Sequence, residues 1–306
     1  MKVFILGATG LIGQRLVAQL LARGDQVSIL TRDADKARKR LGERVQVVQG
    51  DPLASGDWQK HLDGMDGVVN LVGEPIADRA WTPAQRTLIR DSRILSTRQL
   101  VLGLEQAAKR PAVLVQGTAV GIYGERGEER LTEASSPKGG GDFIAELCVQ
   151  WEAEARQAER LGVRVVLLRT GVVLDKRGGA LQKMLLPFQL FAGGPLGNGK
   201  QWFPWIHADD LVGLILFALA QPKVSGALNG TAPESVTMGV FSQSLGQAMH
   251  RPSWMPVPRF ALSLLMGERA DLVLASQRVE PERPLSLGYA FRYPNLGPAL
   301  QAVLAE

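Results

Sequence analysis

Three glycines near the N-terminus have the spacing of a phosphate-binding turn. Gly7, Gly10 and Gly13 follow the apolar run Val3 to Leu6, and helically spaced apolar residues come after them. A tight turn from a strand into a helix needs residues without a Cβ, so that backbone N–H groups can approach a pyrophosphate. The pattern therefore predicts a dinucleotide site. The alternative interpretation is a glycine-rich surface turn.

The end of the next apolar segment, 26–30, indicates which dinucleotide is bound. In such folds the residue at this place faces the adenosine ribose, where a carboxylate accepts from the 2′-OH and an arginine pairs with a 2′-phosphate. Here the residues are Thr31 and Arg32, with Asp33 as the one neighbouring carboxylate. Four further basic residues between positions 36 and 40 add positive charge or form a solvated helix face. Arg32 favours NADP(H), and the alternative is a merely exposed arginine.

Two further segment ends should lie at the same edge of a parallel sheet. Asp51, in Gly50-Asp51-Pro52, could accept from the adenine amino group, although Asp before Pro is also typical of a plain turn. Leu71, Val72 and Gly73 end another apolar segment and would line the dinucleotide through backbone contacts.

Several motifs along the chain resemble those of the extended short-chain dehydrogenases/reductases. Within that superfamily, the glycine-rich segment 193–199 and the segments 203–207 and 229–233 resemble the NAD(P)-dependent epimerase/dehydratase-like "epimerase family" proteins, sometimes labelled cell-division inhibitors. The resemblance runs nearly end to end and implies a Rossmann domain, NADP(H) binding and a small C-terminal lobe over the active cleft. The motifs of the superfamily are Gly7-Ala8-Thr9-Gly10-Leu11-Ile12-Gly13, Gly50-Asp51, Asn70-Leu71-Val72-Gly73, Arg93-Ile94-Leu95-Ser96-Thr97, Thr118-Ala119-Val120-Gly121-Ile122-Tyr123-Gly124 and Arg169-Thr170-Gly171-Val172-Val173.

The resemblance and the strand ends together indicate which residues contact the cofactor. Arg93 stands where many members of the superfamily carry an asparagine near the cofactor, so its cation could contact phosphate or nicotinamide ribose. The alternative for Arg93 is an arginine on a helix surface. The expected cofactor-binding residues are Gly7, Thr9, Gly10, Leu11, Ile12, Gly13, Thr31, Arg32, Asp51, Leu71, Val72, Gly73, Arg93, Gly117, Thr118, Thr170, Gly171 and Val172.

The chain departs from the superfamily at the catalytic pair. Short-chain dehydrogenases usually transfer hydride with a Ser/Thr, a Tyr and a Lys four residues later, which lowers the pKa of the phenol from about 10. No Tyr-x-x-x-Lys occurs in this sequence, and Phe143, which cannot donate a proton, stands where the tyrosine is expected. Thr118 holds the Ser/Thr position and could still hydrogen-bond a substrate carbonyl.

Four residues could replace the missing acid. Tyr123, Asp142, Glu146 and Cys148 are all expected near the cleft. Each also has a structural interpretation, such as Asp142 as a helix N-cap, Glu146 on a helix face and Cys148 as small packing. Thr118 and Tyr123 are the candidate catalytic residues.

A further group of side chains is expected on the substrate side. Lys200, Trp202 and His207 offer a cation, an aromatic face and an imidazole just before a predicted helix. We expect them to line the cleft together with Phe143, although packing and helix capping explain them as well.

Apolar segments alternate with helical patterns over the first part of the chain. This alternation predicts an α/β protein with a doubly wound parallel sheet. The expected strands are 2–6, 26–30, 45–48, 68–71, 112–115 and 163–168, and the helices between them include 33–41, about 82–109 and 142–160.

The alternation degrades after Arg169, where glycines and prolines punctuate the chain. A helix at 208–220 and a strand at 226–229 then return to the sheet. We therefore expect an NADP-binding Rossmann domain over 1–174, completed by about 204–232. A smaller substrate-side, C-terminal domain is expected over 175–203 and 233–306, with a helix at 260–266.

Composition limits the classes of partner. The 306 residues are 45% hydrophobic, enough for a substantial core. One cysteine and three histidines leave no internal disulfide or cysteine-based zinc site and little support for any metal, and they suit the cytoplasm. The net charge of +5 is dispersed, which favours an anionic small ligand over nucleic acid. No export signal is visible, and the longest later apolar run, Leu211 to Ala220, is too short to cross a membrane.

Two functions follow from these patterns. The first is an NADP(H)-binding epimerase or oxidoreductase for a small carbonyl or sugar-type substrate, with Thr118 polarising the substrate oxygen and a non-standard group supplying the proton. The second, favoured by the missing Tyr and Lys, is a catalytically inactive NADP(H)-binding sensor or scaffold. The patterns predict neither the substrate nor the oligomeric state.

Overall fold

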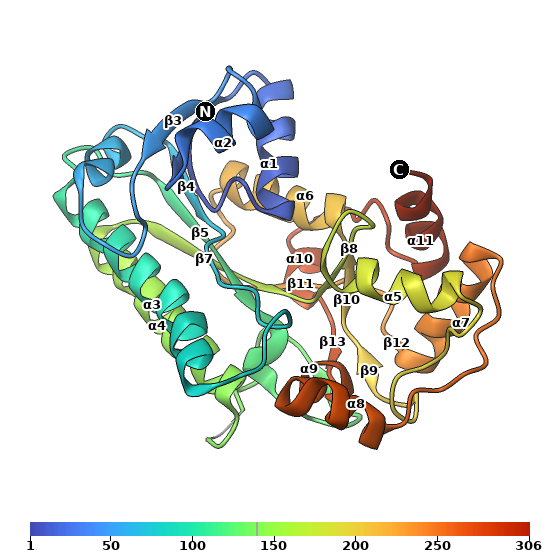
Figure 1. The fold of residues 1–306 in the computed structure, drawn as a ribbon. Coiled ribbons are helices and arrows are strands. Elements are labelled where there is room, and N and C mark those ends of the chain that lie inside the picture. Colours follow the sequence, from blue (N-terminus) through green and yellow to red (C-terminus); the bar gives the residue numbers. More distant parts are fainter. Residues whose placement is uncertain (139) are drawn as a thin grey trace.

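A seven-stranded parallel sheet forms the centre of the protein (Figure 1). In the computed structural model, which describes residues 1–138 and 140–306, the strand order is β11-β7-β5-β4-β1-β2-β3. The strands are β1 (Lys2–Leu6), β2 (Gln26–Thr31), β3 (Gln46–Gln49), β4 (Gly67–Asn70), β5 (Val113–Ala119), β7 (Arg164–Thr170) and β11 (Gly226–Gly230). The chain direction across the sheet reverses between β1 and β4, where ligands of open α/β sheets bind. The doubly wound parallel sheet predicted from the sequence is confirmed.

Helices cover both faces of the sheet. One face carries α1 (Leu11–Ala22), α2 (Ala34–Leu41) and α6 (Ala208–Ala220), and the other carries α3 (Pro83–Gln106) and α4 (Phe143–Arg156). Short 3-10 helices, η1 (Asp57–Leu62) and η3 (Gln157–Leu161), extend the second layer. The helices form because their apolar residues recur on one stripe, which the sheet then buries.

Side-chain caps start the two long helices where the sequence predicts them. The Thr82 hydroxyl accepts from the backbone N–H of Gln85 at 3.2 Å, and Asp142 accepts from Ile144 and Ala145. Each cap satisfies N–H groups that have no partner within the helix. Helix α3 ends at Gln106 and α4 at Arg156, a few residues before the predicted ends.

A smaller lobe lies beside the sheet and has a core of its own. Its elements are α5 (Gly179–Gln189), β9 (Trp202–Phe203), β12 (Val236–Thr237), α7 (Met238–Met249) and α11 (Leu296–Ala305). The rings of Phe203 and Phe241 pack in its centre, 4.5 Å apart. The parallel pair β8 (Val172–Leu174) and β10 (Trp205–His207) joins it to the sheet domain.

The C-terminal part of the chain passes between the two lobes. Helices α8 (Arg259–Met266) and α9 (Asp271–Leu274) flank the 3-10 turn η4 (Gly267–Ala270). Strand β13 (Arg278–Val279) then pairs with β6 (Arg130–Leu131), and α10 (Glu282–Ser286) contacts β11. Part of the segment 233–306 therefore packs against the larger domain.

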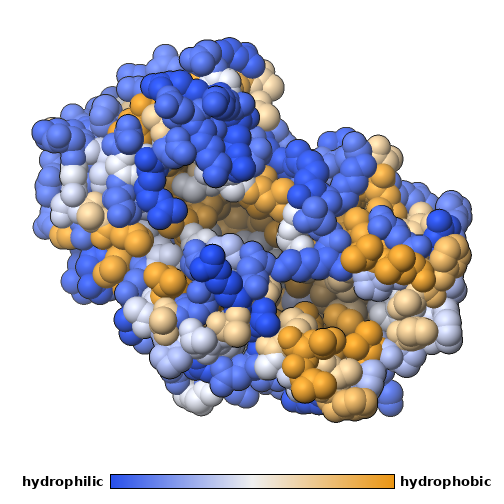
Figure 2. All heavy atoms as spheres, in the orientation of Figure 1, coloured by the Kyte–Doolittle hydropathy of each residue, from blue (hydrophilic) through white to orange (hydrophobic). Residues whose placement is uncertain are grey.

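The surface is hollowed between the two lobes (Figure 2). The outer faces are mostly hydrophilic, whereas apolar residues gather inside the hollow and around α8. No helix among the described residues is long and apolar enough to span a bilayer.

Candidate functional site

The strands β1, β2 and β4 end around a cavity of about 450 Å³, the strand-end cavity. Its lining comes from the glycine turn, from the ends of β2 and β4, from the loop after β3, and from α2 and α3. Its carboxylates are Asp33, Asp51, Glu74 and Asp91. The predicted cofactor residues that line it are Gly7, Thr9, Gly10, Thr31, Arg32, Asp51, Leu71, Val72 and Gly73.

Close backbone packing explains why the turn contains glycine. Gly7 has φ of +81°, and a Cβ there would lie 2.7 Å from the carbonyl carbon of Leu71. A Cβ on Gly13 would lie 2.4 Å from the carbonyl oxygen of Gly7. Helix α1 begins after Gly10 with no side-chain cap, so its first N–H groups remain available to an anion.

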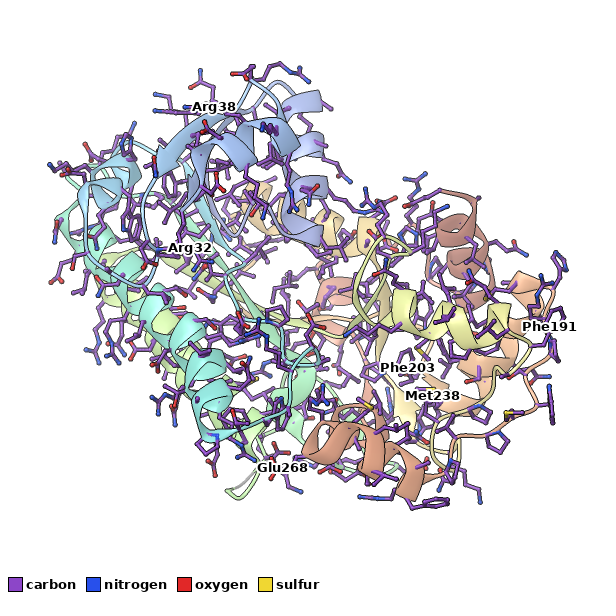
Figure 3. All side chains as sticks on the ribbon, in the orientation of Figure 1. Arg32, Arg38, Phe191, Phe203, Met238 and Glu268 are labelled. Carbon is purple, nitrogen blue, oxygen red and sulfur yellow. The ribbon has the colours of Figure 1, made fainter. Side chains whose placement is uncertain are left out.

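Positive side chains gather at the end of the strand-end cavity that lies beside β2 and α2. Arg32, Lys36 and Arg40 line it, and none of the three forms an ion pair with any residue that the structure describes. Arg32 lies beside the hollow, whereas Arg38 lies at the outer side of α2 (Figure 3). Asp33 lines the same cavity but forms no ion pair with Arg32 in the part of the chain that the structure describes, and its Oδ1 caps α2 by accepting from the backbone N–H of Lys36 at 2.9 Å.

Asp51 takes part in a turn and also lines the cavity. Its Oδ1 accepts from the backbone N–H of Leu53 at 3.0 Å, as in the plain turn that Asp-Pro indicates. The side chain is exposed, so its other oxygen remains available to a ligand.

Arg93 is a partly buried cation behind the cavity wall. Its NH1 group donates to the carbonyl oxygens of Glu74 at 3.1 Å and Ile89 at 3.0 Å, and its guanidinium lies 5.2 Å from the ring centre of Trp151. Burial lowers the pKa of Arg93, and no described carboxylate pairs with it. A Cβ on Gly73 would meet the Arg93 guanidinium at 3.0 Å, so this group lies directly behind the lining.

The other predicted cofactor residues do not line the strand-end cavity. Leu11 packs against Gly178, Ile12 against the sheet core, and the Thr170 hydroxyl donates to the Leu168 carbonyl at 3.3 Å. Four more of these residues are in close contact with neighbouring backbone. Gly13 packs against Gly7, Gly117 lies beside Asn70, and Gly171 and Val172 pack against Pro204.

Thr118 and Tyr123 belong to a buried network rather than to a cavity wall. Arg169 pairs with both oxygens of Glu152 at 2.8 Å, and Glu152 also accepts from the Thr118 hydroxyl at 3.3 Å. The Tyr123 hydroxyl accepts from Arg169 at 2.9 Å and donates to Asn229 at 2.8 Å. Tyr123 is fully buried and burial raises its pKa. This geometry does not support proton transfer from Tyr123 to a substrate.

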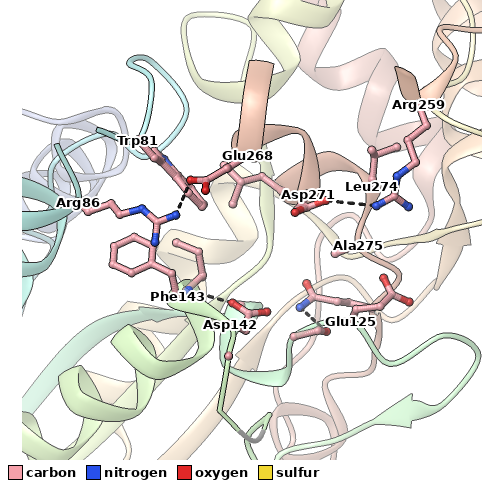
Figure 4. A pocket seen from close by; sticks show the side chains of 16 residues that line it. Trp81, Arg86, Glu125, Asp142, Phe143, Arg259, Glu268, Asp271, Leu274 and Ala275 are labelled. Carbon is pink, nitrogen blue, oxygen red and sulfur yellow. Dashed lines mark hydrogen bonds and ion pairs between the residues drawn. The ribbon is translucent and has the colours of Figure 1, made fainter. Parts of the chain in front are cut away.

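A second cavity, the interlobe pocket, lies between the start of α4 and the helices α8 and α9 (Figure 4). It has a volume of about 530 Å³. Phe143 lines it, with its ring 5.5 Å from that of Trp81 and 4.9 Å from the guanidinium of Arg86. The other lining side chains are Glu125, Asp142, Ile144, Arg259, Glu268, Asp271, Leu272, Leu274, Ala275 and Gln277, with the glycines 121, 124 and 141.

The structure does not bring Lys200, Trp202 and His207 into the interlobe pocket. Lys200 lines a separate surface hollow, and the indole N–H of Trp202 donates to Glu128 at 2.7 Å. His207 is fully buried and caps α6 by accepting from the backbone N–H of Asp209 at 3.0 Å, which corresponds to the capping alternative. Burial lowers the pKa of His207.

His207, Asp209 and Glu306 bring possible metal-ligand atoms within 4.8 Å of one another. The guanidinium of Arg15 occupies the same place, pairing with Asp209 at 2.9 Å, with Asp175 at 2.7 Å and with Glu306. Because this cation already neutralises the carboxylates, the group is an ion-pair cluster between the lobes.

Of the four replacements for the missing acid, Asp142 lines the interlobe pocket. Its Oδ1 caps α4 by accepting from Ile144 at 2.9 Å and from Ala145 at 3.0 Å, and its second oxygen has no partner among the described residues. Glu146 accepts from the backbone N–H of Gly141 at 2.8 Å. Cys148 is buried, and burial raises the pKa of its thiol to about 12.

The sheet order, the glycine turn at its switch point and the basic cavity end define a dinucleotide-binding protein of the Rossmann class. The chain belongs to the NAD dependent epimerase/dehydratase family, whose model matches residues 3–230. Residues 257–303 match a domain of unknown function, DUF1731.

Curated relatives and solved structures support this assignment. A chloroplastic homologue of epimerase family protein SDR39U1 from Arabidopsis thaliana is 46% identical, covering 99% of this chain and 87% of the relative. The structure of human SDR39U1, isoform 2, with NADPH has a TM-score of 0.90 and 37% identity and covers all of both chains. UDP-glucuronic acid 4-epimerase from Bacillus cereus, in complex with UDP-glucuronic acid and NAD, shares the fold at a TM-score of 0.79 and 18% identity, covering 100% of this chain and 98% of the other.

Proposed function

We propose that the protein binds NADP(H) in the strand-end cavity and acts there as an oxidoreductase or epimerase on a small substrate held in the interlobe pocket. The observation that carries the cofactor assignment is the charge at the end of β2. Arg32 lines the cavity with no ion-pair partner among the described residues, while Asp33 is engaged as the cap of α2. A free arginine at this place suits a 2′-phosphate, and a free carboxylate would suit a 2′-hydroxyl.

Different residues of the chain bind the pyrophosphate and the 2′-phosphate of the cofactor. Gly7 and Gly10 let the backbone approach the pyrophosphate, and the uncapped N–H groups of α1 donate to it. Arg32 pairs with the 2′-phosphate, with Lys36 and Arg40 beside it. When bound, the cofactor supplies the hydride that the reaction transfers.

We assign the non-standard proton donor to Asp142 or to a water held by it. Asp142 lines the interlobe pocket and uses one oxygen as a helix cap, which leaves the other to hold or pass a proton. Phe143 and Trp81 give this side of the pocket an apolar wall. Thr118 and Tyr123 act through the network around Glu152 and Arg169, which fixes the end of β5 beside β7.

Substitution of Arg32 by Glu tests the cofactor assignment. We expect Arg32→Glu to weaken NADPH binding by about a hundredfold, about 2.7 kcal/mol, and to leave NADH binding within about threefold. Arg38→Glu is the matched control, because it makes the same charge change six residues further along, on α2, at a residue outside the cavity lining. Titration calorimetry with both nucleotides gives the answer, and an unchanged preference for NADPH in Arg32→Glu would overturn the assignment.

An inactive NADP(H) sensor is the second candidate. It is favoured by Phe143 in place of a tyrosine and by the burial of Thr118 and Tyr123. Consumption of NADPH with a panel of aldehydes, ketones and sugars separates the two functions. Oxidation that is lost in Asp142→Asn, whose amide oxygen still caps α4, supports the enzyme. Tight NADPH binding without turnover across the panel supports the sensor.

A further inference from the structure

We infer that the interlobe pocket takes a substrate that carries no anionic group in the part that enters the pocket and that offers a planar, aromatic or conjugated face. This inference rests on the proposed function, in which the same pocket holds the substrate. It depends on two features of the lining: how each positive group is paired, and where the aromatic rings lie.

Both guanidinium groups among the described lining residues are already paired with carboxylates. Arg86 of α3 forms an ion pair with Glu268 of η4 across the pocket (Figure 4). Arg259 of α8 lies 3.5 Å from the carboxylate of Asp271 on α9. An anionic ligand would therefore compete with a carboxylate of the chain for either arginine.

The helix N-terminus at the pocket is blocked as well. A free helix N-terminus attracts anions through its unpaired N–H groups and its dipole. At the start of α4, the Asp142 carboxylate accepts from the backbone N–H groups of Ile144 and Ala145. The Glu146 carboxylate accepts from the backbone N–H of Gly141, just before the helix. Both carboxylates also oppose the positive helix end, so this natural anion site is already filled.

Carboxylates outnumber cations around the pocket. Glu125, Asp142, Glu268 and Asp271 face the two arginines Arg86 and Arg259. Glu125 is held in place by the backbone N–H groups of Gly127 and Ser276. A nucleoside diphosphate would bring at least two negative charges into a lining whose described residues offer no unpaired cation, so the electrostatic balance disfavours it.

The aromatic pair gives the pocket a binding face for a flat group. Trp81 and Phe143 meet edge to face at 5.5 Å, and the Arg86 guanidinium lies within 5.8 Å of both ring centres. Ile144, Leu272 and Leu274 add apolar surface to the lining. Rings and planar cations stack favourably in such surroundings, whereas a hydrated anion loses its water without compensation.

Ligand-observed NMR on the full-length NADPH complex tests this inference without requiring turnover. The probes are acetophenone, 4-acetylbenzoate and UDP-glucuronic acid, of which the first two differ by one carboxylate. We expect acetophenone to bind at least about tenfold more tightly than 4-acetylbenzoate, a difference of about 1.4 kcal/mol. UDP-glucuronic acid should not displace acetophenone. Binding of either anionic probe as tightly as acetophenone, or no binding of acetophenone, would overturn the inference.

Two sets of variants locate the effect in this pocket. Phe143→Ala should weaken acetophenone binding by about tenfold, whereas Phe191→Ala, an exposed phenylalanine outside the pocket, should leave it unchanged.

The double substitution Glu268→Gln with Asp271→Asn frees both arginines and should raise the affinity for 4-acetylbenzoate by about tenfold. The control Glu43→Gln with Glu282→Gln neutralises two exposed carboxylates outside the lining and should change nothing. Equal effects of the test and control pairs would assign the discrimination to net charge and overturn the inference.

The two proposals fail in different ways. If acetophenone binds with this selectivity but NADPH is not consumed with any carbonyl compound, the proposed reaction fails and the character of the pocket stands. If NADPH is consumed with anionic substrates that bind in the interlobe pocket, the reaction stands and the inference fails.

Discussion

The strand-end cavity and the interlobe pocket each lie at the N-terminus of a helix. They differ in whether the positive charge at that helix end is already paired with carboxylates of the chain. Helix α1 begins at a glycine without a cap, and the cations beside it have no carboxylate partner among the described residues. Helix α4 begins at Asp142, and the arginines near it are paired. The first arrangement leaves positive charge for an anionic ligand, and the second has already satisfied it within the chain.

The largest effect is expected where the strand-end cavity depends on backbone shape. In Gly13→Ala, the new Cβ would lie 2.4 Å from the Gly7 carbonyl oxygen and 2.6 Å from the Ala8 backbone, so the turn must move. We expect NADPH affinity to fall by about a hundredfold or more, about 2.7 kcal/mol. The free energy of unfolding should fall by about 1–3 kcal/mol. Calorimetry and denaturant unfolding measure the two quantities.

Two other glycines provide the controls for Gly13→Ala. A Cβ on Gly10 meets the Gly7 carbonyl oxygen at 3.3 Å, so Gly10→Ala should cost less in both measurements. A Cβ on Gly297 in α11 meets nothing within 4 Å, and alanine there should leave NADPH binding unchanged. Equal losses in Gly13→Ala and Gly297→Ala would show that close packing of the turn does not control the cavity.

The sequence predicts half of the residues expected at the strand-end cavity to be where the structure has them, in its lining, because that cavity is built from local signals. A glycine turn after a strand, a basic residue at a strand end and a capping residue before a helix each determine nearby backbone, and the sheet order then brings the strand ends together. Among the predicted residues that do not line the cavity, Gly13 and Gly171 are glycines that close backbone packing requires.

The substrate side was harder to predict because its contacts join distant parts of the chain. The pairing of Arg86 with Glu268 spans 182 residues, and no local pattern indicates it. The sequence pattern does not predict helix α5, because Pro187 lies inside it and two glycines stand at its start. The positions of Tyr123 and His207 in the chain predict a place near the cleft, whereas both side chains are buried inside the protein.

A second prediction concerns Arg93, the cation behind the strand-end cavity. If Arg93 contacts the nicotinamide half of the cofactor, Arg93→Met should weaken NADPH binding by about tenfold. The same variant should leave binding of 2′,5′-ADP, which lacks that half, unchanged. Arg93→Lys should restore part of the loss, and Arg90→Met, an exposed arginine on the same helix, is the control. Equal weakening of both ligands would give Arg93 a purely structural role.

A smaller effect is expected at His207, which lies at the junction of the lobes rather than in either cavity. Burial lowers its pKa below the ordinary value of 6.5, so the unfolded state binds the proton more readily than the folded state. Its contribution to stability is therefore present above about pH 6.5 and is lost as the pH falls through the lowered pKa of the folded state.

Thermal unfolding of His207→Asn measures this contribution. Asparagine can still cap α6 but does not titrate, so the drop in Tm between about pH 7.5 and about pH 5.5 should be about 2 °C smaller than in the unsubstituted protein. His61 and His250 are exposed, and His250→Asn serves as the control. A Tm drop of the same size in His207→Asn would mean that another group carries the acid sensitivity.

The smallest effect on stability is expected for the ion pair that crosses the interlobe pocket. The side chains of Arg86 and Glu268 are 36% and 62% exposed, and exposed pairs contribute about 0–1 kcal/mol. Arg86→Gln should therefore lower Tm by less than about 2 °C, as should Arg98→Gln, whose partner Glu154 lies in the same domain.

Ligand binding should separate these two variants even though stability does not. Arg86→Gln leaves Glu268 without its partner and makes the pocket more negative, so 4-acetylbenzoate should bind more weakly still, while Arg98→Gln leaves its binding unchanged. A Tm drop of more than about 5 °C in Arg86→Gln, with no change in ligand binding, would make the pair a clamp between the lobes. The expected loss of stability is small because both side chains of the pair are exposed. The Arg86–Glu268 ion pair therefore affects the charge of the pocket far more than the stability of the fold.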